Sequence, residues 1–451
     1  MEPPPDMQLG PDYVLLLNCT MYGLNEAMAD FDAHFAAVFQ GDTVHEGKPK
    51  LSMRRGLADP SLFYNEERTV LVSKHVDDGL IIGPGSEIDA ILVQLGAYFL
   101  LKVTEPLEQG RCEQYLGRLV TKVPGGFHIC CRPTLIQRFL EITGMTNAAP
   151  VATPGIKLEA RVAGEKELDA QAASQYRAAA GLLLFISLER FDLAYAAKEC
   201  ARGMTKPTVG DKTRIKRVAR YLRSAGDMFQ ELTRRACDDN GDGEDSLVAE
   251  VDSDWAADKI ERKSTSAGVL FFNRIPVQTW SRTQEVIALS SGEAEAYALV
   301  SGAKELLGTS AILKDIGIEP SFTLASDSTS AISMHSRPGL GRNKHIQIKY
   351  LFLQQLVARK ALEIKKISTH LNSADPWTKY LEKHTFSKLR EQVRIIDDRT
   401  VNSVDECDHD QQSNDKRRIQ SFSEVCTGLH ICFTGLASVL HGSMMRNNSK
   451  V

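Results

Sequence analysis

The run Leu247-Val-Ala-Glu-Val-Asp252-Ser-Asp-Trp255 constrains the fold of this chain most, because an apolar segment there ends in a carboxylate. It follows the acidic, glycine-containing segment 238–245, which is typical of a loop. The run is therefore expected to be the first strand of a new domain, with a boundary near residue 245. Residues after it are expected to supply partners for Asp252.

The segments after Asp252 predict an α/β domain with a mixed five-stranded sheet. Strands are expected over 247–251, 267–272, 276–281, 322–326 and 362–367. Helices are expected over 291–307, 328–334 and 345–360, with a last helix that opens at 372–375 just before Pro376. This order of elements is that of the ribonuclease H fold, with carboxylates at the first strand, first helix, fourth strand and last helix.

The segment before residue 245 predicts a second α/β region. A strand is expected over 13–18 and a helix over 25–39. Two further strands, 69–73 and 80–83, are expected to form a hairpin with Asp77 and Asp78 at its tip. Adjacent carboxylates in a tight turn can bind a divalent metal, although a solvated Asp-Asp-Gly turn is the commoner meaning of such a segment.

An amphipathic helix is expected over 211–223, with Ile215, Val218, Ala219 and Leu222 on its apolar side. Its other side carries the four cations Lys212, Lys216, Arg220 and Arg223. These cations could follow a phosphate backbone or form a solvated basic face, and the spacing does not separate the two.

Composition excludes several classes of protein. The formal net charge is -4 over 451 residues, so the chain is not a basic nucleic-acid binder overall, and any nucleic-acid site must be local. Nine cysteines without paired CxxC spacing argue against a zinc site and favour a reducing compartment. The apolar segment 425–440 is interrupted by glycines, so we expect no membrane span.

An ordered series of motifs resembles the polymerase region of copia-type LTR retrotransposons. The segment 17–27 (LNCTMYGLNEA) is similar to LNKSLYGLKQA in that family, and His75-Val-Asp-Asp78 is similar to its YVDD box. Further matches follow in the family's order at 115–117 (YLG), 144–154 (GM to PVATP), 176–181 (YR to G) and 191–195 (FDLAY). In the later domain, 251–256, 290–297, 326–332 and 372–379 resemble SDADWA, SSTEAEY, CDNQSAI and NxADIFTK.

The resemblance covers roughly residues 1–395 and implies a domain plan. It implies a truncated reverse transcriptase palm and thumb-like region over 1–157 and a connection segment over 158–245. A ribonuclease H-like domain would occupy 246–395, followed by a variable, poorly ordered tail over 396–451. The first polymerase aspartate lies upstream of the family segment at which this chain begins, and His75 replaces the family's Tyr. Polymerase activity is therefore expected to be lost through truncation.

The same resemblance implies the site and its chemistry. It assigns catalysis and metal binding to Asp252, Glu295, Asp327 and Asp375, with Asp77 and Asp78 as further metal ligands. Two Mg²⁺ ions, or Mn²⁺, about 4 Å apart would serve hydrolysis of RNA in an RNA–DNA hybrid. By resemblance, Asp252 bridges both ions, Glu295 and Asp327 complete one site, and Asp375 completes the other.

The implied partners are an RNA–DNA hybrid and other Pol or Gag products, in the cytoplasm (virus-like particle) or the nucleus. The alternative function is a non-catalytic relic of a retroelement, or a nucleic-acid-binding module put to a new use.

Several neighbouring residues are given structural roles. Asp254 and Glu293 lie one or two positions from the family match and are expected to be solvated surface acids. Trp255 and Trp280 are expected in the core rather than as stacking platforms. His345 could equally begin a packed helix or contact substrate.

Overall fold

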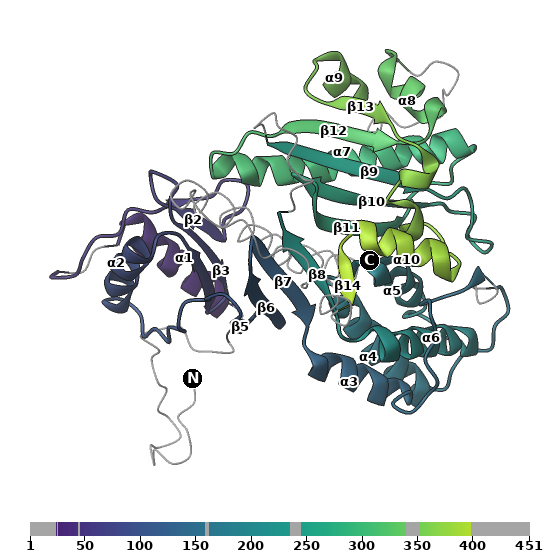
Figure 1. Ribbon diagram of the computed structural model, residues 1–451, viewed down its shortest axis with the longest axis horizontal. Coiled ribbons are helices and arrows are strands. Elements are labelled where there is room, and N and C mark those ends of the chain that lie inside the picture. The colour runs from purple at the N-terminus through teal and green to yellow at the C-terminus, as the bar shows by residue number, and fades with distance from the viewer. Residues whose placement is uncertain are drawn as a thin grey trace, which may run out of the picture. The chain divides into compact units, whose positions relative to one another are not determined.

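The computed structural model describes residues 24, 26–43, 46–157, 162–234, 245–339 and 352–397. These residues form two compact units, Met1–Thr104 and Glu105–Val451 (Figure 1). The strand expected at 13–18, the motif at 17–23, His345 and the tail after 397 lie outside the described residues.

The first unit is an antiparallel sheet with two helices. Its sheet has the order β1 (Arg54–Arg55), β2 (Leu62–Tyr64), β3 (Leu71–His75), β4 (Asp78–Ile82), and its helices are α1 (Ala27–Gln40) and α2 (Gly85–Gly96). Phe39 and Phe63 are fully buried, and the Phe35 ring stacks on Phe39 with centroids 4.3 Å apart. The predicted hairpin is confirmed, and its strands reach as far as the pair His75 and Asp78.

The second unit contains an antiparallel five-stranded sheet and four helices that pack near it. The sheet order is β14 (Ile395–Asp397), β8 (Met228–Thr233), β7 (Gly126–Cys131), β6 (Arg118–Val123), β5 (Cys112–Tyr115). The helices are α3 (Pro133–Thr143), α4 (Ala170–Ile186), α5 (Ala194–Arg202) and α6 (Val209–Ala225), with the 3-10 turn η3 (Phe191–Leu193) before α5. The sheet therefore joins strands that are more than 260 residues apart in the chain.

Helix α6 confirms the amphipathic prediction. It starts at a capping box, in which Thr208 Oγ1 accepts from Asp211 N at 3.1 Å and the Asp211 carboxylate accepts from Thr208 N at 3.0 Å. Its apolar face, with Ile215, Val218, Ala219 and Leu222, is buried. Local capping and burial of one face therefore fix this helix where the sequence expects it.

A mixed five-stranded sheet forms the other half of the second unit and confirms the predicted fold class. Its order is β11 (Ile275–Thr283), β10 (Thr265–Phe272), β9 (Ser246–Ser253), β12 (Ser321–Ser326), β13 (Glu363–Lys366). Strands β9, β10 and β11 are antiparallel, whereas β12 runs parallel to both β9 and β13. The remaining helices are α7 (Ser291–Asp315), α8 (Thr329–Ser336), α9 (Phe352–Ala358) and α10 (Lys383–Gln392).

Strand β10 is buried along its whole length because both faces of the sheet are covered. Helix α7 packs against β9, β10 and β12 on one face (Figure 1). Ala267, Val269 and Phe271 of β10 belong to the same apolar core as the α3, α4, α5 and α6 helices. The segments predicted as connection and ribonuclease H-like domain thus share a core.

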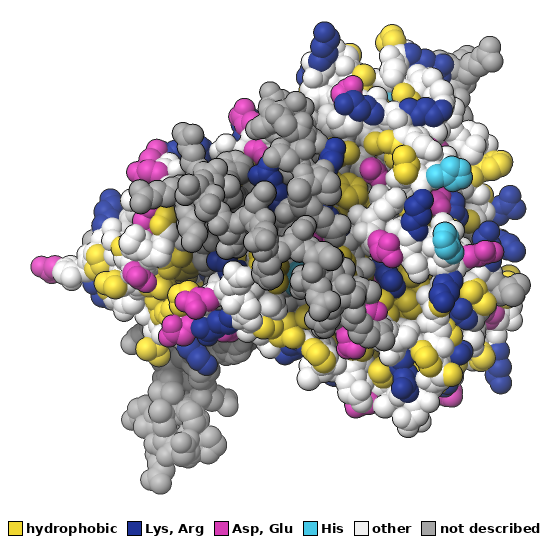
Figure 2. All heavy atoms as spheres, viewed as in Figure 1, with side chains coloured by type: hydrophobic (Ala, Val, Ile, Leu, Met, Phe, Trp, Pro, Cys, Tyr) yellow, Lys and Arg dark blue, Asp and Glu magenta, His cyan; other side chains and the backbone are white. Residues whose placement is uncertain are grey.

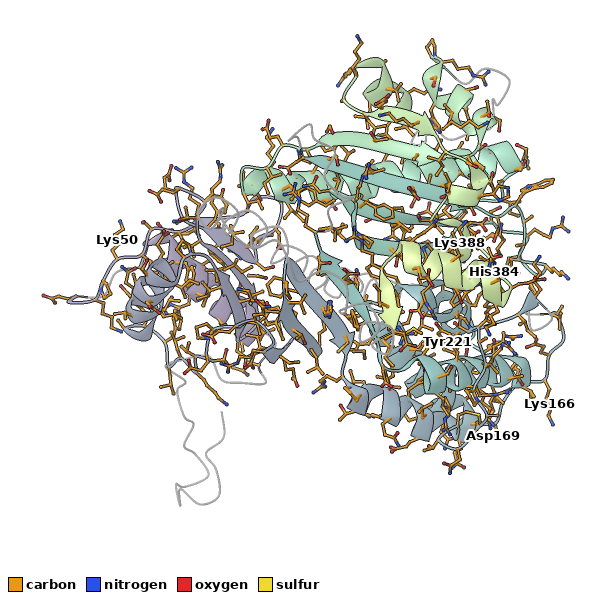
Figure 3. The ribbon with its side chains drawn as sticks, in the orientation of Figure 1. Lys50, Lys166, Asp169, Tyr221, His384 and Lys388 are labelled. Atoms are coloured by element: carbon orange, nitrogen blue, oxygen red, sulfur yellow. The ribbon has the colours of Figure 1, made fainter. Side chains whose placement is uncertain are left out.

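A buried polar network also joins α10 to the helices before it. Arg190 forms an ion pair with Asp192 of η3 at 2.7 Å, and the Tyr221 hydroxyl donates to Asp192 Oδ2 at 2.6 Å. Arg390 of α10 donates to the Tyr221 hydroxyl at 3.4 Å, where Figure 3 labels Tyr221. Arg190, Asp192 and Tyr221 are thus buried with hydrogen-bond partners, as buried polar groups require, and Arg390 links them to α10.

The last helix differs from the prediction. The segment from Asn372 does not open an α-helix: it enters the 3-10 turn η7 (Asp375–Trp377), and α10 begins only at Lys383. Asn372 and Thr378 hydrogen-bond to β9 instead of continuing a helix. Contacts with the sheet therefore override the helix-start signal of Pro376.

The surface carries charges of both signs. Basic and acidic side chains are interspersed over the face shown in Figure 2. Among the described residues, no helix combines the length and the apolar character needed to cross a membrane.

Candidate metal centre

Asp252 lies at the end of the central strand β9. Leu247, Ala249 and Val251 of this strand are fully buried, and Asp252 is 6% exposed. Its Oδ2 accepts a hydrogen bond from Thr378 Oγ1 at 2.7 Å. Burial raises the pKa of Asp252 to about 7; the Thr378 hydrogen bond lowers it, and the charges of Asp375 and Asp327 raise it. The ionised form of this carboxyl is therefore unfavourable unless a positive charge lies beside it.

Glu295 comes from the second turn of α7, whose start is fixed by side chains. Ser290 caps the helix, with Glu293 N donating to Ser290 Oγ at 3.2 Å. Burial, followed by the charges of Asp252 and Asp327, raises the pKa of Glu295 to about 9. Its Oε2 is buried and has no hydrogen-bond partner among the described residues. Such an oxygen is suited to a cation.

Asp327 follows β12 and reaches the same edge of the sheet as Asp252. The parallel pairing of β12 with β9, with Ala325 opposite Glu250, brings the two strand ends together. Ligand oxygens of Asp252, Glu295 and Asp327 all lie within 4.8 Å of one another. This three-carboxylate cluster is the one group of three or more acidic, His or Cys residues found with metal-site spacing in the described part of the chain.

Asp375 lies beside this cluster but outside the 4.8 Å group. Its carboxylate is paired with the ammonium of Lys379, four residues later, and its charge still raises the pKa of Asp252. Three hydrogen bonds fix this segment to β9: Asn372 Nδ2 to Val251 O (3.0 Å), Ser373 N to Glu250 Oε2 (2.8 Å), and Thr378 Oγ1 to Asp252. The structure therefore brings three of the four predicted carboxylates into one cluster and holds the fourth through Lys379.

The sequence interpretation named neither Thr378 nor Lys379 as functional residues. Both residues belong to the motif at 372–379, and that motif is the sequence feature that could have indicated a functional role for them. Their roles depend on the return of this segment to β9, which no local pattern reveals.

The prediction of solvated acids was wrong for both residues. Glu293 is 2% exposed, and its carboxylate accepts from Leu289 N at 3.0 Å and from the Tyr297 hydroxyl. It is buried because it caps the start of α7. Asp254 is partly buried, its Oδ1 accepts from Thr265 N at 2.9 Å, and burial raises its pKa. Neither residue belongs to the three-carboxylate cluster.

The prediction for the tryptophans was right for Trp280 and wrong for Trp255. Trp280 is 4% exposed, whereas Trp255 is 55% exposed. The Trp255 indole N–H donates to Ala288 O at 3.1 Å, which ties the loop after β9 to the loop before α7. The indole N–H is therefore held by this hydrogen bond while about half of the residue stays exposed.

Asp77 and Asp78 are exposed at the β3–β4 turn of the first unit. Within the described residues they belong to no group of three acidic side chains with metal-site spacing. Their assignment as metal ligands stays a prediction.

The four cations of α6 have unequal surroundings. Arg220 Nε donates to Ala149 O at 2.7 Å, and Arg223 donates to Thr146 O, so both hold the loop after α3. Lys212 and Lys216 are half-buried. Their role in nucleic-acid binding stays a prediction.

Together, a mixed five-stranded sheet and carboxylates gathered at the end of its central strand define an α/β protein with a candidate metal centre. Sequence comparison then gives its relatives: the homologues that match about 85% of the chain are Pol polyproteins of copia-type retrotransposons. Its sequence is 28% identical over 401 residues to the retrovirus-related Pol polyprotein from transposon RE2 of Arabidopsis thaliana. The aligned region covers 86% of this chain and 25% of that protein.

A second relative, the Pol polyprotein from transposon TNT 1-94 of Nicotiana tabacum, is 27% identical over 84% of this chain and 28% of its own length. The chain thus spans about a quarter of the Pol polyproteins that it matches. No protein-family model matches. A foamy viral protease-reverse transcriptase solved with an RNA/DNA hybrid is 13% identical, with a TM-score of 0.38 over 66% of this chain and 36% of that chain.

Proposed function

We propose that this chain is a metal-dependent nuclease that cleaves the RNA strand of RNA–DNA hybrids. The observation that carries the proposal is the three-carboxylate cluster, in which oxygens from β9, α7 and the end of β12 lie within 4.8 Å. Similarity to retrovirus-related Pol polyproteins supports nucleic acid as the substrate class. The unpartnered, buried Oε2 of Glu295 fits a divalent cation, because hard cations bind carboxylate oxygens.

Asp252, Glu295 and Asp327 would hold Mg²⁺ or Mn²⁺, with Asp375 as the fourth ligand. Ions bound there supply positive charge for the scissile phosphate and for the attacking water. The other tasks belong to the chain itself. Thr378 orients Asp252 through its 2.7 Å hydrogen bond, and Ser290 fixes the helix that presents Glu295. Such partners of metal ligands set ligand geometry.

Without a cation, the cluster would hold protons instead. The pKa of Glu295, raised to about 9 by burial and by the neighbouring acids, keeps its carboxyl protonated at neutral pH. Binding of a cation therefore releases protons from the cluster, and affinity for the metal rises with pH.

The test compares Asp252→Asn with Asp254→Asn in the full chain, using a labelled RNA–DNA hybrid and Mg²⁺. Asp252→Asn is expected to reduce cleavage by more than roughly a hundredfold, because even partners of metal ligands are worth about 10–100-fold. Asp254→Asn is the matched control: its side chain lies outside the cluster, and an amide oxygen can still accept from Thr265 N.

Equal cleavage by both variants would exclude Asp252 as the centre of the site. A folded wild-type protein that binds the hybrid but never cuts it would support the alternative of a nucleic-acid-binding module. In that case the salt dependence of binding is expected to weaken when Lys212 and Lys216 are replaced.

A further inference from the structure

Lys379 is a cation built into the edge of the candidate metal centre. Its ammonium contacts Asp375 Oδ1, and the Asp375 side chain is 15% exposed. The ammonium also acts electrostatically on Asp252 and Asp327. One lysine thus faces three of the four carboxylates that the family resemblance assigns to metal binding.

The backbone that carries Lys379 is fixed, but the end of its side chain is not enclosed. Thr378, the residue before it, is fully buried and hydrogen-bonds both Asp252 Oδ2 at 2.7 Å and Asp375 O at 3.0 Å. The Lys379 side chain is 43% exposed. A four-carbon stem with a partly exposed end can move its charge without any change in the backbone.

The three-carboxylate cluster and Asp375 differ in whether a cation of the protein already pairs with them. At the three-carboxylate cluster, Glu295 Oε2 has no hydrogen-bond partner among the described residues, so a cation there displaces no ion pair of that oxygen. At Asp375, a divalent ion must displace an ammonium already in contact. Like charges in a partly buried site repel strongly, so the ammonium and a second ion compete for Asp375.

We infer that Lys379 controls entry of the second metal ion. In the free protein it pairs with Asp375, and a single divalent ion binds at Asp252, Glu295 and Asp327. A phosphate of the nucleic-acid substrate attracts the Lys379 ammonium, releases Asp375 and admits the second ion. The inference rests on the proposed function, and Lys379 acts as a positioning residue.

The experiment counts tightly bound Mn²⁺ in the full chain, free of nucleic acid, by the electron paramagnetic resonance signal of unbound Mn²⁺. Wild type is expected to bind one ion tightly. Lys379→Met, which removes the charge and keeps a linear side chain, is expected to tighten the second ion by roughly tenfold or more. Lys379→Arg keeps the charge and is expected to bind one ion, as wild type does.

A second arm adds an RNA–DNA hybrid that is 2′-O-methylated, so that it presents phosphates and resists cleavage. The wild-type count is expected to rise from one tight ion to two. A count that stays at one overturns the gating by phosphate.

The outcomes separate the two proposals. Absence of any tight Mn²⁺ in folded wild type overturns the proposed function together with the inference. Two tight ions in wild type, or identical binding by wild type and Lys379→Met, overturns the inference alone. Thermal melting of each variant confirms that it is folded before the count is made.

Discussion

At the scale of single residues, the burial of Asp252 among other acids makes the stability of the fold depend on pH. Asp252 is 6% exposed, its neighbours are acidic, and its pKa is raised to about 7. An ordinary aspartate in the unfolded chain titrates near 3.9. The folded state therefore binds more protons than the unfolded state between about pH 4 and pH 7. The stabilisation that the protonated Asp252 carboxyl gives the folded state is complete below about pH 4 and is lost as the pH rises through 7.

We predict that Asp252→Asn is more stable than wild type at pH 8 without metal, by on the order of 2 kcal/mol, and equally stable near pH 4. Urea unfolding at both pH values in EDTA measures the difference. Added Mg²⁺ is expected to stabilise wild type and not the variant, because only a folded, complete site binds the ion. A variant less stable than wild type at pH 8 contradicts the raised pKa of this carboxyl and the stability that its ionisation costs.

At the scale of elements, the loops after β9 and before α7 meet at Trp255. The chain has three tryptophans, and Trp280 and Trp377 are 4% and 0% exposed, whereas Trp255 is 55% exposed. Trp255 is thus the tryptophan that solvent can reach, three residues beyond Asp252.

We predict that iodide quenches one part of the tryptophan fluorescence and that Trp255→Phe removes this part. An RNA–DNA hybrid bound at the metal centre is expected to reduce the quenching, because it covers the faces of the ring. Trp280→Phe is the matched control and is expected to leave the accessible part unchanged. Quenching that survives in Trp255→Phe would contradict the exposure of this ring.

The elements also show what sequence can predict. Strand β9 and helix α6 follow from the spacing of apolar residues, and the positions of Asp252 and Asp327 at strand ends follow from the sequence order. The parallel pairing that brings these two strand ends together is seen only in the structure. Glu293 and Trp255 were misjudged because their exposure depends on a cap and on two loops that meet in space. The start of the last helix was misplaced because Asn372 and Thr378 bond to a strand more than 100 residues earlier.

At the scale of the whole molecule, the second unit is held together by a core that crosses the predicted boundary near residue 245. Ala267, Val269 and Phe271 pack with the helices of the segment before it, and β14 returns to pair with β8. The sequence predicts the boundary from a loop-like composition, but contacts between distant segments decide how independently each side folds.

We predict that a fragment of residues 245–397 is less stable than residues 105–397 by several kcal/mol. Removing the preceding helices uncovers apolar side chains of β10, each worth about 1.5–3 kcal/mol when large and fully buried. Denaturant unfolding of the two fragments measures the difference, and the longer one is expected to unfold in a single transition. Equal stability of the two fragments would show that the boundary at 245 separates independent folding units.

The parallel pairing of β9 with β12 has a consequence for synthesis of the chain. Strand β9 ends at Ser253, yet its partner β12 begins at Ser321, and the segment that orients Asp252 through Thr378 follows later still. A ribosome must therefore release well over 100 further residues before Asp252 can meet all of its partners. Long-range pairings of this kind also form slowly. A nascent or prematurely terminated chain thus carries isolated acidic side chains rather than the assembled three-carboxylate cluster.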